Sequence, residues 1–404
     1  MKTLLLLLLT LTLNSYKSTS KDTKIKEGHW RTELFLNKKD TLPFSFYYYS
    51  SSKKIVIINA SERIELKDIE INGDIISVKF PIFNSKLIGR FTSKKIIEGF
   101  WHNDSKGTDY KIPFKSVFSD YNRFFTEQTN ADAFTGKWEA TFNYSDKNHS
   151  EKAIGLFEEI LGTIHGTFLT ETGDYRFLGG ISYGNKLKLS CFDGSHAFLF
   201  KAELKEDTLW GSFFSGKHYN SKWYAVRNSS FELRDPEKLT YVVNDSLLQF
   251  SFKDLNSIDY NYPNKTLKNK VVLLQILGTW CPNCMDETNF LTSIYSKYRE
   301  EIEIIAVGFE TGKTEKAKLA ALRRYKNHMG IDYPILLGGE ASKTCAVKLF
   351  PMLNNVISFP TLLIIDKKGD IRKIHTGFCG PSTGKYYTDF VENTTRFIEQ
   401  LIAE

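Results

Sequence analysis

Residues 271–291, VVLLQILGTWCPNCMDETNFL, decide the fold of the C-terminal part of the chain. An apolar run typical of a buried strand stops at Gly278. An amphipathic helix is predicted to begin at Pro282, where the missing N–H of proline costs nothing. Cys281 and Cys284 stand at this junction with two residues between them. The pattern therefore predicts a strand, a turn and a helix that opens on a cysteine pair.

The placement of the two cysteines favours redox chemistry. Cys281 lies at the positive end of the predicted helix, where backbone N–H groups and the macrodipole favour a thiolate. The spacing returns Cys284 to the same side about one turn later, so the two sulfurs can close a small ring. An exposed thiolate would attack a substrate disulfide, and the second sulfur would resolve the mixed disulfide. Trp280 offers an aromatic wall beside the nucleophile, or it simply packs between sheet and helix.

A zinc site is an alternative for the same cysteines. His375 and Cys379 supply a second pair of ligand types. However, a long stretch of chain separates the two pairs, and His375 is expected to project from a strand. This spacing differs from that of ordinary zinc sites, so the redox interpretation is favoured and no metal is expected.

Composition limits the other classes of function. The chain has 404 residues, which predicts more than one domain. Its formal net charge of +7 is modest, and basic residues alternate with acidic ones, so no nucleic-acid partner is expected. Five cysteines are too few for a scaffold held together by disulfides. Aromatic residues make up 14% of the chain, which favours β-structure.

The first residues predict export. Lys2 is followed by an apolar stretch over residues 4–13. That stretch is about half the length that a helix needs to cross a bilayer, but it suits a secretory signal. Residues 1–20 are therefore interpreted as a signal peptide. The mature protein is expected to be extracytoplasmic, in the periplasm, without stable membrane insertion.

The region that follows predicts two β-units that repeat one another. Short alternating segments broken by Gly, Asn, Asp and Ser are typical of antiparallel strands. Three pairs of segments match in the same order, roughly 110 residues apart: GHWRTELFL and GKWEATFNY, INGDIISVKF and SYGNKLKLSCF, KKIIEGFW and EDTLWGSFF. We expect a barrel or sandwich over residues 21–128 and its repeat over residues 129–238, with the join in EQTNADAFTG.

The sequence of the β-region is compatible with more than one role. Trp30 and Trp138 each follow a glycine by two residues and could line a ligand cavity, but packing in the core is favoured. Cys191 shares a strand face with Leu187 and Leu189, so it is expected to be a small inert core residue. The β-units could serve as a recognition module or as a dimerisation surface, and the sequence does not choose between these.

From about residue 239 the pattern changes to alternating strands and helices, which indicates a central sheet covered on both sides. The predicted elements are strands in 247–255, 270–277, 302–309 and 333–337, helices in 282–301, 314–329, 342–353 and 386–402, and a hairpin in 361–377. The predicted fold class is therefore multidomain, with an all-β N-terminal region followed by an α/β domain over residues 239–404.

The residues GTWCPNC, Glu287 shortly after them, and SFPT before a late strand resemble thioredoxin-fold proteins of the TlpA/ResA branch. The resemblance covers residues 245–404, and these relatives are exported thiol-disulfide oxidoreductases. It implies that Cys281 is the attacking thiol, that Cys284 is the buried resolving thiol, and that Glu287 helps to move protons.

The same resemblance implies how a substrate is held. Pro360 corresponds to a cis-proline that faces the cysteine pair, and Phe359, Thr361, Trp280 and Pro282 are the other candidate substrate-binding residues. The stretch between the second helix and SFPT corresponds to an insertion typical of the branch. The only cofactor implied is the redox-active disulfide between the two cysteines. The implied partners are proteins with thiols or disulfides and an upstream electron donor in the envelope, and the oligomeric state stays open.

Two features depart from the pattern of the family. Many thioredoxins carry a buried Asp where this chain has Gln275, which cannot take a proton, so Glu287 or water would have to do so. Glu287 could instead be favourable only electrostatically near the start of a helix. Cys379 is a candidate accessory redox cysteine or a small inert residue, and the inert role is favoured. Cys345 is expected to be buried and silent.

Three functions compete. The leading hypothesis is an exported disulfide oxidoreductase that acts as a reductant. A peroxiredoxin-type peroxidase would need Thr and Arg beside one cysteine, and Thr279 lies close, but the second cysteine would capture the thiolate first. The third hypothesis is a β-region that binds a ligand or partner, with an accessory redox domain.

Overall fold

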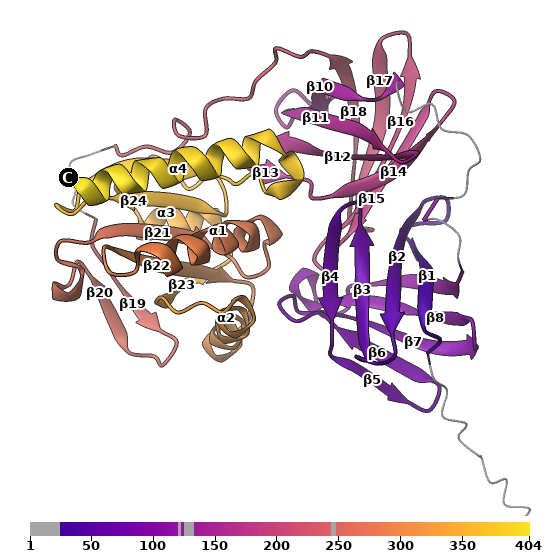
Figure 1. Cartoon of the computed structure of the whole chain (residues 1–404), viewed down its shortest axis with the longest axis horizontal. Helices are drawn as coiled ribbons and strands as arrows, with labels where there is room; N and C mark the ends of the chain where they lie inside the picture. The colour runs from indigo at the N-terminus through magenta and orange to yellow at the C-terminus, as the bar shows by residue number, and fades with distance from the viewer. Residues whose placement is uncertain (1–24, 120–122, 125–132, 244–247) are drawn as a thin grey trace, which may run out of the picture.

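The computed structural model describes residues 25–119, 123–124, 133–243 and 248–404 (Figure 1). The predicted signal peptide and most of the join EQTNADAFTG lie outside these residues. An all-β region is followed by a C-terminal domain with a mixed sheet and helices, so the predicted fold class is confirmed.

The first β-unit is a sheet of antiparallel strands that is open between its two terminal strands. The strands, in chain order, are β1 (Gly28–Phe35), β2 (Thr41–Tyr49), β3 (Lys54–Asn59), β4 (Glu62–Leu66), β5 (Ile69–Asn72), β6 (Ile75–Lys79), β7 (Ser85–Ser93), β8 (Ile96–Asn103) and β9 (Lys111–Phe118). The spatial order is β4-β3-β2-β1-β9-β8-β7-β6-β5, which leaves β4 and β5 at the two ends.

The second β-unit has corresponding strands and closes into a barrel. Its strands are β10 (Gly136–Phe142), β11 (Glu151–Ile160), β12 (Thr163–Thr170), β13 (Gly173–Asp174), β14 (Leu178–Tyr183), β15 (Lys186–Phe192), β16 (Ala197–Lys205), β17 (Thr208–Ser215) and β18 (Tyr219–Arg227). Because β11 pairs with both β10 and β12, the strands from β10 to β18 form a ring, with the short β13 outside it.

The two units repeat one another in detail. Gly28 and Gly136 begin β1 and β10 with φ angles of 128° and 122°, a region that favours glycine. Trp30 and Trp138 are both fully buried, and each indole N–H donates to a carbonyl four residues earlier, at 2.9 and 2.8 Å. Both Trp side chains therefore pack in their cores, as favoured from the sequence.

The C-terminal domain is built on one mixed sheet. Its strands are β19 (Phe250–Asp254), β20 (Asp259–Tyr262), β21 (Val271–Leu277), β22 (Ile302–Glu310), β23 (Ile335–Glu340), β24 (Thr361–Ile365) and β25 (Ile371–Thr376), in the order β20-β19-β23-β22-β21-β24-β25. The central strands β21, β22 and β23 are parallel. Every residue of β21 is buried, which explains its uninterrupted apolar pattern.

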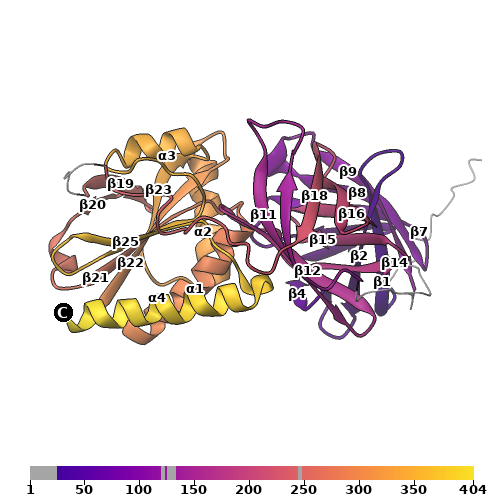
Figure 2. The ribbon, with the colours of Figure 1, turned by 90° about the horizontal axis from the view of Figure 1, so that it is seen from above.

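Helices cover both faces of this sheet, as the periodicity predicts (Figure 2). They are α1 (Pro282–Tyr298), α2 (Glu315–Met329), α3 (Lys343–Leu349) and α4 (Lys385–Ala403). Phe290 of α1 contacts Phe390 of α4, and Tyr325 of α2 bonds to Thr288 of α1, so these three helices share a face, and α3 lies on the other. No helix in the described part of the chain is long and apolar enough to cross a bilayer.

The turn between β15 and β16 joins all three parts of the molecule. Phe192 at the end of β15 is fully buried and belongs to the core of the first unit, where it packs on Phe44. Asn59 of β3 donates to the carbonyl of Phe192 at 2.9 Å. Ser195 in the same turn donates to the carbonyl of Trp280 at 2.9 Å. The β-region is therefore packed directly against the loop that carries the cysteine pair.

Candidate active site

The cysteine pair is positioned by a buried strand and the start of a helix. Gly278 follows β21, and a Cβ at this position would lie 2.4 Å from the indole nitrogen of Trp280, so a larger residue would not fit. The Trp280 indole N–H donates to the carbonyl of Phe309 at 2.9 Å. Cys281 is the N-cap of α1, and Pro282 occupies the first turn. The predicted strand, turn and helix are all present.

The two sulfurs lie in different environments. Cys281 is half-buried, and its Sγ accepts a hydrogen bond from the backbone N–H of Cys284 at 3.3 Å. The Cys281 thiol also lies 3.4 Å from the carbonyl oxygen of Phe359, to which it donates; the Phe359–Pro360 peptide bond is cis. Cys284 is fully buried, and burial, followed by the hydrogen bond with Cys281, raises the pKa of Cys284 well above its ordinary value. Of the two sulfurs, only that of Cys281 belongs to a residue that is not fully buried.

Glu287 lies on α1, three residues after Cys284, and one of its carboxyl oxygens has no hydrogen-bond partner among the described residues. The side chain is fully buried, and its Oε2 accepts from the amide of Gln275 at 2.8 Å. Its Oε1 has no hydrogen-bond partner among the described residues. Burial raises the pKa of Glu287 to about 8. A carboxyl group with this pKa can exchange a proton near neutral pH.

Gln275 positions this carboxyl group instead of carrying the proton. Its amide also lies 3.4 Å from the carbonyl of Cys284, and its Oε1 accepts from Thr288 at 3.1 Å. Tyr325 donates to Thr288 at 2.8 Å. The sequence analysis noticed Gln275 only as a missing acid, and it missed Tyr325, which carried no distinguishing signal on its helix.

Glu310 is a second buried acid that the sequence analysis missed. It ends β22 and accepts from both the backbone N–H and the hydroxyl of Thr279, at 2.9 and 2.7 Å. Burial raises the pKa of Glu310 to about 7. An acid at the end of an otherwise apolar strand was the available signal. Because Glu310 engages the Thr279 hydroxyl, that hydroxyl is held away from the role that the peroxidase hypothesis gave it.

A comparison with protein families matches residues 242–387 to the family described as Redoxin. The match lies in the C-terminal part of the chain, and residues 242–387 are called the Redoxin domain below. Two curated relatives are similar to it. The thioredoxin-like protein YneN of Bacillus subtilis is 31% identical over 111 residues, which are 27% of this chain and 58% of YneN. The thiol-disulfide oxidoreductase ResA of Geobacillus kaustophilus is 27% identical over 142 residues, which are 35% of this chain and 73% of ResA.

The chain thus spans little more than half the length of YneN. Among solved structures, a thiol:disulfide interchange protein from Chlorobium tepidum is 16% identical, with a TM-score of 0.29. The likeness covers 38% of this chain and 93% of that chain.

The other predicted site residues differ in how close they lie to the cysteine pair. Trp280 and Phe359 make an edge-to-face contact with ring centroids 5.7 Å apart. Thr361 is buried and donates to the carbonyl of Ser358 at 2.8 Å, so it shapes the loop before β24. Cys379 follows β25, and burial raises its pKa, which keeps the thiol protonated at neutral pH. Cys345 is a free thiol on α3 that is half-buried, so the expectation that it is buried was wrong.

The residues of the zinc alternative do not converge. His375 packs on Phe390 with ring centroids 4.6 Å apart, and burial lowers the pKa of His375 to about 4. Within the described ranges, no group of three or more His, Cys, Asp or Glu side chains is arranged to hold a metal ion.

The hairpin between β12 and β13 covers one side of the cysteine pair. The carbonyl of Thr172 accepts from the Ser358 hydroxyl at 2.8 Å, next to Phe359. The Asp174 carbonyl accepts from the Asn283 amide at 3.3 Å, and the Asp174 carboxylate accepts from the backbone N–H of Gly380 at 2.6 Å. This hairpin therefore contacts the loop before β24, the start of α1 and the loop after β25.

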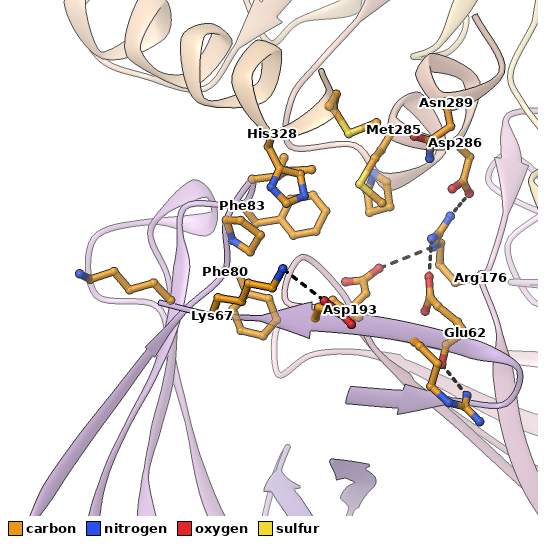
Figure 3. A pocket seen from close by; sticks show the side chains of 18 of the residues that line it. Glu62, Lys67, Phe80, Phe83, Arg176, Asp193, Met285, Asp286, Asn289 and His328 are labelled. Atoms are coloured by element: carbon orange, nitrogen blue, oxygen red, sulfur yellow. Dashed lines mark hydrogen bonds and ion pairs between the residues drawn. The ribbon is translucent and has the colours of Figure 1, made fainter. Parts of the chain in front are cut away.

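A buried ionic cluster joins both β-units to α1 (Figure 3). Arg176 of the second unit is almost fully buried and bonds to Asp286 of α1. It also bonds to Glu62 of β4 at 2.8 Å and lies 3.8 Å from Asp193. Burial raises the pKa of Asp286 to about 6 although Arg176 opposes this shift. The four charges come from distant parts of the sequence, so no local pattern could have predicted the cluster.

A cavity of about 690 Å³ opens beside this cluster (Figure 3). It lies between the first β-unit and the Redoxin domain. Its lining includes β4, the β6–β7 loop, Arg176, Asp193, the side of α1 that carries Pro282, Met285, Asp286 and Asn289, and His328 and Met329 at the end of α2. The cavity reaches Pro282, the residue next to Cys281, and no residue of the β12–β13 hairpin is among its lining residues.

Replacing Arg176 with methionine is expected to destabilise the protein by about 3–5 kcal/mol, because it leaves buried carboxylates without a counter-charge. The matched control is Arg234→Met, whose exposed guanidinium pairs with Glu171 on the surface and should contribute about 1 kcal/mol or less. Urea denaturation of both variants measures the difference. Equal stability of the two variants would contradict a structural role for the cluster.

Proposed function

We propose that the protein is a thiol-disulfide oxidoreductase that reduces protein disulfides with Cys281 and Cys284. The observation that carries this proposal is the asymmetry of the pair. An accessible sulfur caps α1 and accepts a backbone N–H bond, while a fully buried sulfur lies behind it. The similarity of the Redoxin domain to ResA supports the same activity.

The proposed reaction has two steps that balance. The Cys281 thiolate bonds to one substrate sulfur, the substrate S–S bond breaks, and the other substrate sulfur leaves as a thiolate that takes a proton. Cys284 then loses its proton to Glu287 and attacks Cys281, which releases the first substrate sulfur and forms the Cys281–Cys284 disulfide. Two electrons have moved to the substrate, and an external dithiol donor restores the pair. The redox-active disulfide is the only cofactor that this chemistry requires.

The location and partners follow from the same proposal. The apolar stretch at residues 4–13 supports export to an extracytoplasmic space, most simply the periplasm. The substrates would be proteins with disulfides, and the electron donor would be a dithiol protein of the envelope. The β-units would act in recognition, because they contact the loops around Cys281. A dimerisation role for the β-units remains the alternative.

Equilibration with glutathione tests the activity and its direction. We expect the full chain to accelerate reduction of insulin by dithiothreitol. Its cysteine pair should have a reduction potential more negative than about −180 mV, the value of protein disulfide isomerase. A potential near about −120 mV, that of a strong periplasmic oxidant, would show that the protein is an oxidase and not a reductase.

A further inference from the structure

The cavity beside Pro282 is bordered by the edge of a sheet. β4 is the terminal strand of the first β-unit and pairs only with β3 in the described part of the chain. Four residues of β4 (Glu62, Arg63, Ile64 and Glu65) line the cavity. A terminal strand presents main-chain N–H and C=O groups that can pair with another extended chain.

The register of β4 identifies these groups. β3 and β4 are joined by a two-residue turn of Ala60 and Ser61, so Asn59 and Glu62 face each other as the pair that closes the hairpin. The main-chain groups of such a closing pair bond to each other, and the bonding direction alternates along an antiparallel strand. The N–H and C=O groups of Arg63 and Glu65 therefore point away from β3.

The arrangement of the β-region limits what can approach Cys281. On one side the β12–β13 hairpin occupies the loops next to Phe359 and Asn283. On the other side the cavity of about 690 Å³ extends from Pro282 to β4. This volume suits a slender ligand, since ordinary ligand pockets span roughly 300–1,000 Å³. The 5 residues of β4 span about 17 Å, which matches a short extended segment.

We infer that this cavity is the substrate-binding site, and that it takes an extended polypeptide segment that pairs with the edge of β4 and brings its disulfide to Cys281. The inference rests on the proposed oxidoreductase function. In this inference the first β-unit recognises the main chain of the substrate, and this recognition does not depend on the side chains of the substrate. Disulfides in flexible or unfolded segments are then the substrates, because a compact folded protein cannot enter the cavity.

The charge at the α1 end of the cavity adds a preference for basic side chains. Three carboxylates, those of Glu62, Asp193 and Asp286, surround the guanidinium of Arg176, and the guanidinium of Arg63 donates to the carbonyls of Ala60 and Glu62 nearby. Asp193 has a further partner in His196 at 3.3 Å. This end is therefore acidic overall, and it complements a lysine or arginine next to the cysteine of the bound segment.

The test uses the full chain and two probes. The first probe is an unstructured ten-residue peptide with one cysteine between two lysines, oxidised to its symmetrical disulfide. The second is hydroxyethyl disulfide, which has no main chain to pair.

The Glu65→Pro substitution removes the N–H that points away from β3. The hydrogen bonds between β3 and β4 do not use this N–H, so β4 can tolerate proline at this position. We expect the ratio of kcat/KM for the peptide to that for hydroxyethyl disulfide to fall about 10-fold.

Ile71→Pro is the matched control. Ile71 lies on β5, the other terminal strand. Asn72 and Ile75 are the pair that closes the turn between β5 and β6, so the N–H of Ile71, one residue before that pair, points away from β6. It does not line the cavity. The ratio should stay at the wild-type value in this variant. An unchanged ratio in Glu65→Pro, or an equal fall in Ile71→Pro, would overturn strand pairing on β4.

Two further measurements need no variant. A peptide with serine in place of cysteine should slow hydrogen exchange at the amides of Arg63 and Glu65, and unchanged exchange at saturation would overturn the site. The second measurement compares the lysine peptide with a peptide that has glutamates in place of the lysines. The rate of each peptide with the protein is divided by the rate of the same peptide with dithiothreitol, which corrects for intrinsic reactivity. The corrected rate should be lower for the glutamate peptide, and an equal or higher corrected rate would overturn the charge preference. Failure of the wild type to reduce hydroxyethyl disulfide would instead count against the proposed function, and the exchange measurement would still test the site.

Discussion

Replacing Cys281 with serine is expected to lower the rate of insulin reduction by ~1,000-fold or more, because a hydroxyl at neutral pH cannot replace a thiolate as the attacking group. The residual sulfur, Cys284, cannot substitute for it. Cys284 is fully buried, and its pKa is raised well above the ordinary value. Loss of activity in this variant should therefore occur without any covalent intermediate.

The Cys284→Ser variant should behave differently. Cys281 can still attack, but nothing resolves the mixed disulfide, so the substrate stays covalently attached. Non-reducing gel electrophoresis and intact mass measurement after incubation with the oxidised peptide detect this species. Cys345→Ser serves as the control, because this cysteine lies on α3, away from the pair. Trapping of the peptide by Cys281→Ser would reverse the roles assigned to the two cysteines. Equal trapping by Cys284→Ser and Cys345→Ser would show that Cys284 is not the resolving thiol.

Replacing Glu287 with glutamine is expected to stabilise the protein at neutral pH while it slows turnover. Burial raises the pKa of Glu287 from its ordinary 4.5 to about 8. Between these values the folded state holds a proton that the unfolded state has lost. The wild type is therefore most stable, with respect to this group, below pH 4.5, and it loses that stability as the pH rises through 8. At pH 7 the cost is about 3 kcal/mol, and glutamine does not incur it.

The same substitution removes the proton acceptor for Cys284. General acid–base groups typically contribute ~100-fold or more to a rate, so turnover should fall by about that factor. The wild-type rate of resolution should rise with pH up to about 8, and this rise should be absent in Glu287→Gln.

Urea midpoints and stopped-flow rates between pH 5 and pH 9 measure both effects. Glu300→Gln, an exposed position at the end of the same helix region, is the matched control and should change neither. Lower stability of Glu287→Gln at pH 7, or an unchanged pH profile, would show that Glu287 has a structural role only.

Local patterns predicted the elements of the Redoxin domain other than β20, which the sequence analysis missed. The apolar run of β21 is buried along its whole length, and Pro282 begins α1. Phe390, Phe397 and Leu401 lie on the face of α4 that packs on the core. Tyr386 lies one turn before Phe390, but its hydroxyl bonds to Glu232 of the β-region at 2.9 Å. Periodicity shows which residues face a core, but it does not show what else packs on the end of a helix.

The repeat of the β-units was also visible in the sequence, since Gly28 and Gly136 need the same backbone conformation and Trp30 and Trp138 fill the same place in each core. The closure of the second unit, and the opening of the first at β4, were not visible. In the second unit β12 pairs with β14, whereas the terminal strands β4 and β5 of the first unit do not pair with each other, and such pairing is set by the curvature of the whole sheet.

The sequence by itself determined the cysteine pair at a helix start and the all-β and α/β parts, whereas the proposed proton role of Glu287 came from the resemblance to the TlpA/ResA branch. These depend on residues close together in the chain, where spacing alone fixes the geometry. Only the tertiary structure decided that Arg176, Glu62, Asp193 and Asp286 meet beside the pair, and that β4 borders the cavity next to Pro282. Such contacts arise when whole domains pack together, and no periodicity in the chain records which surfaces will meet.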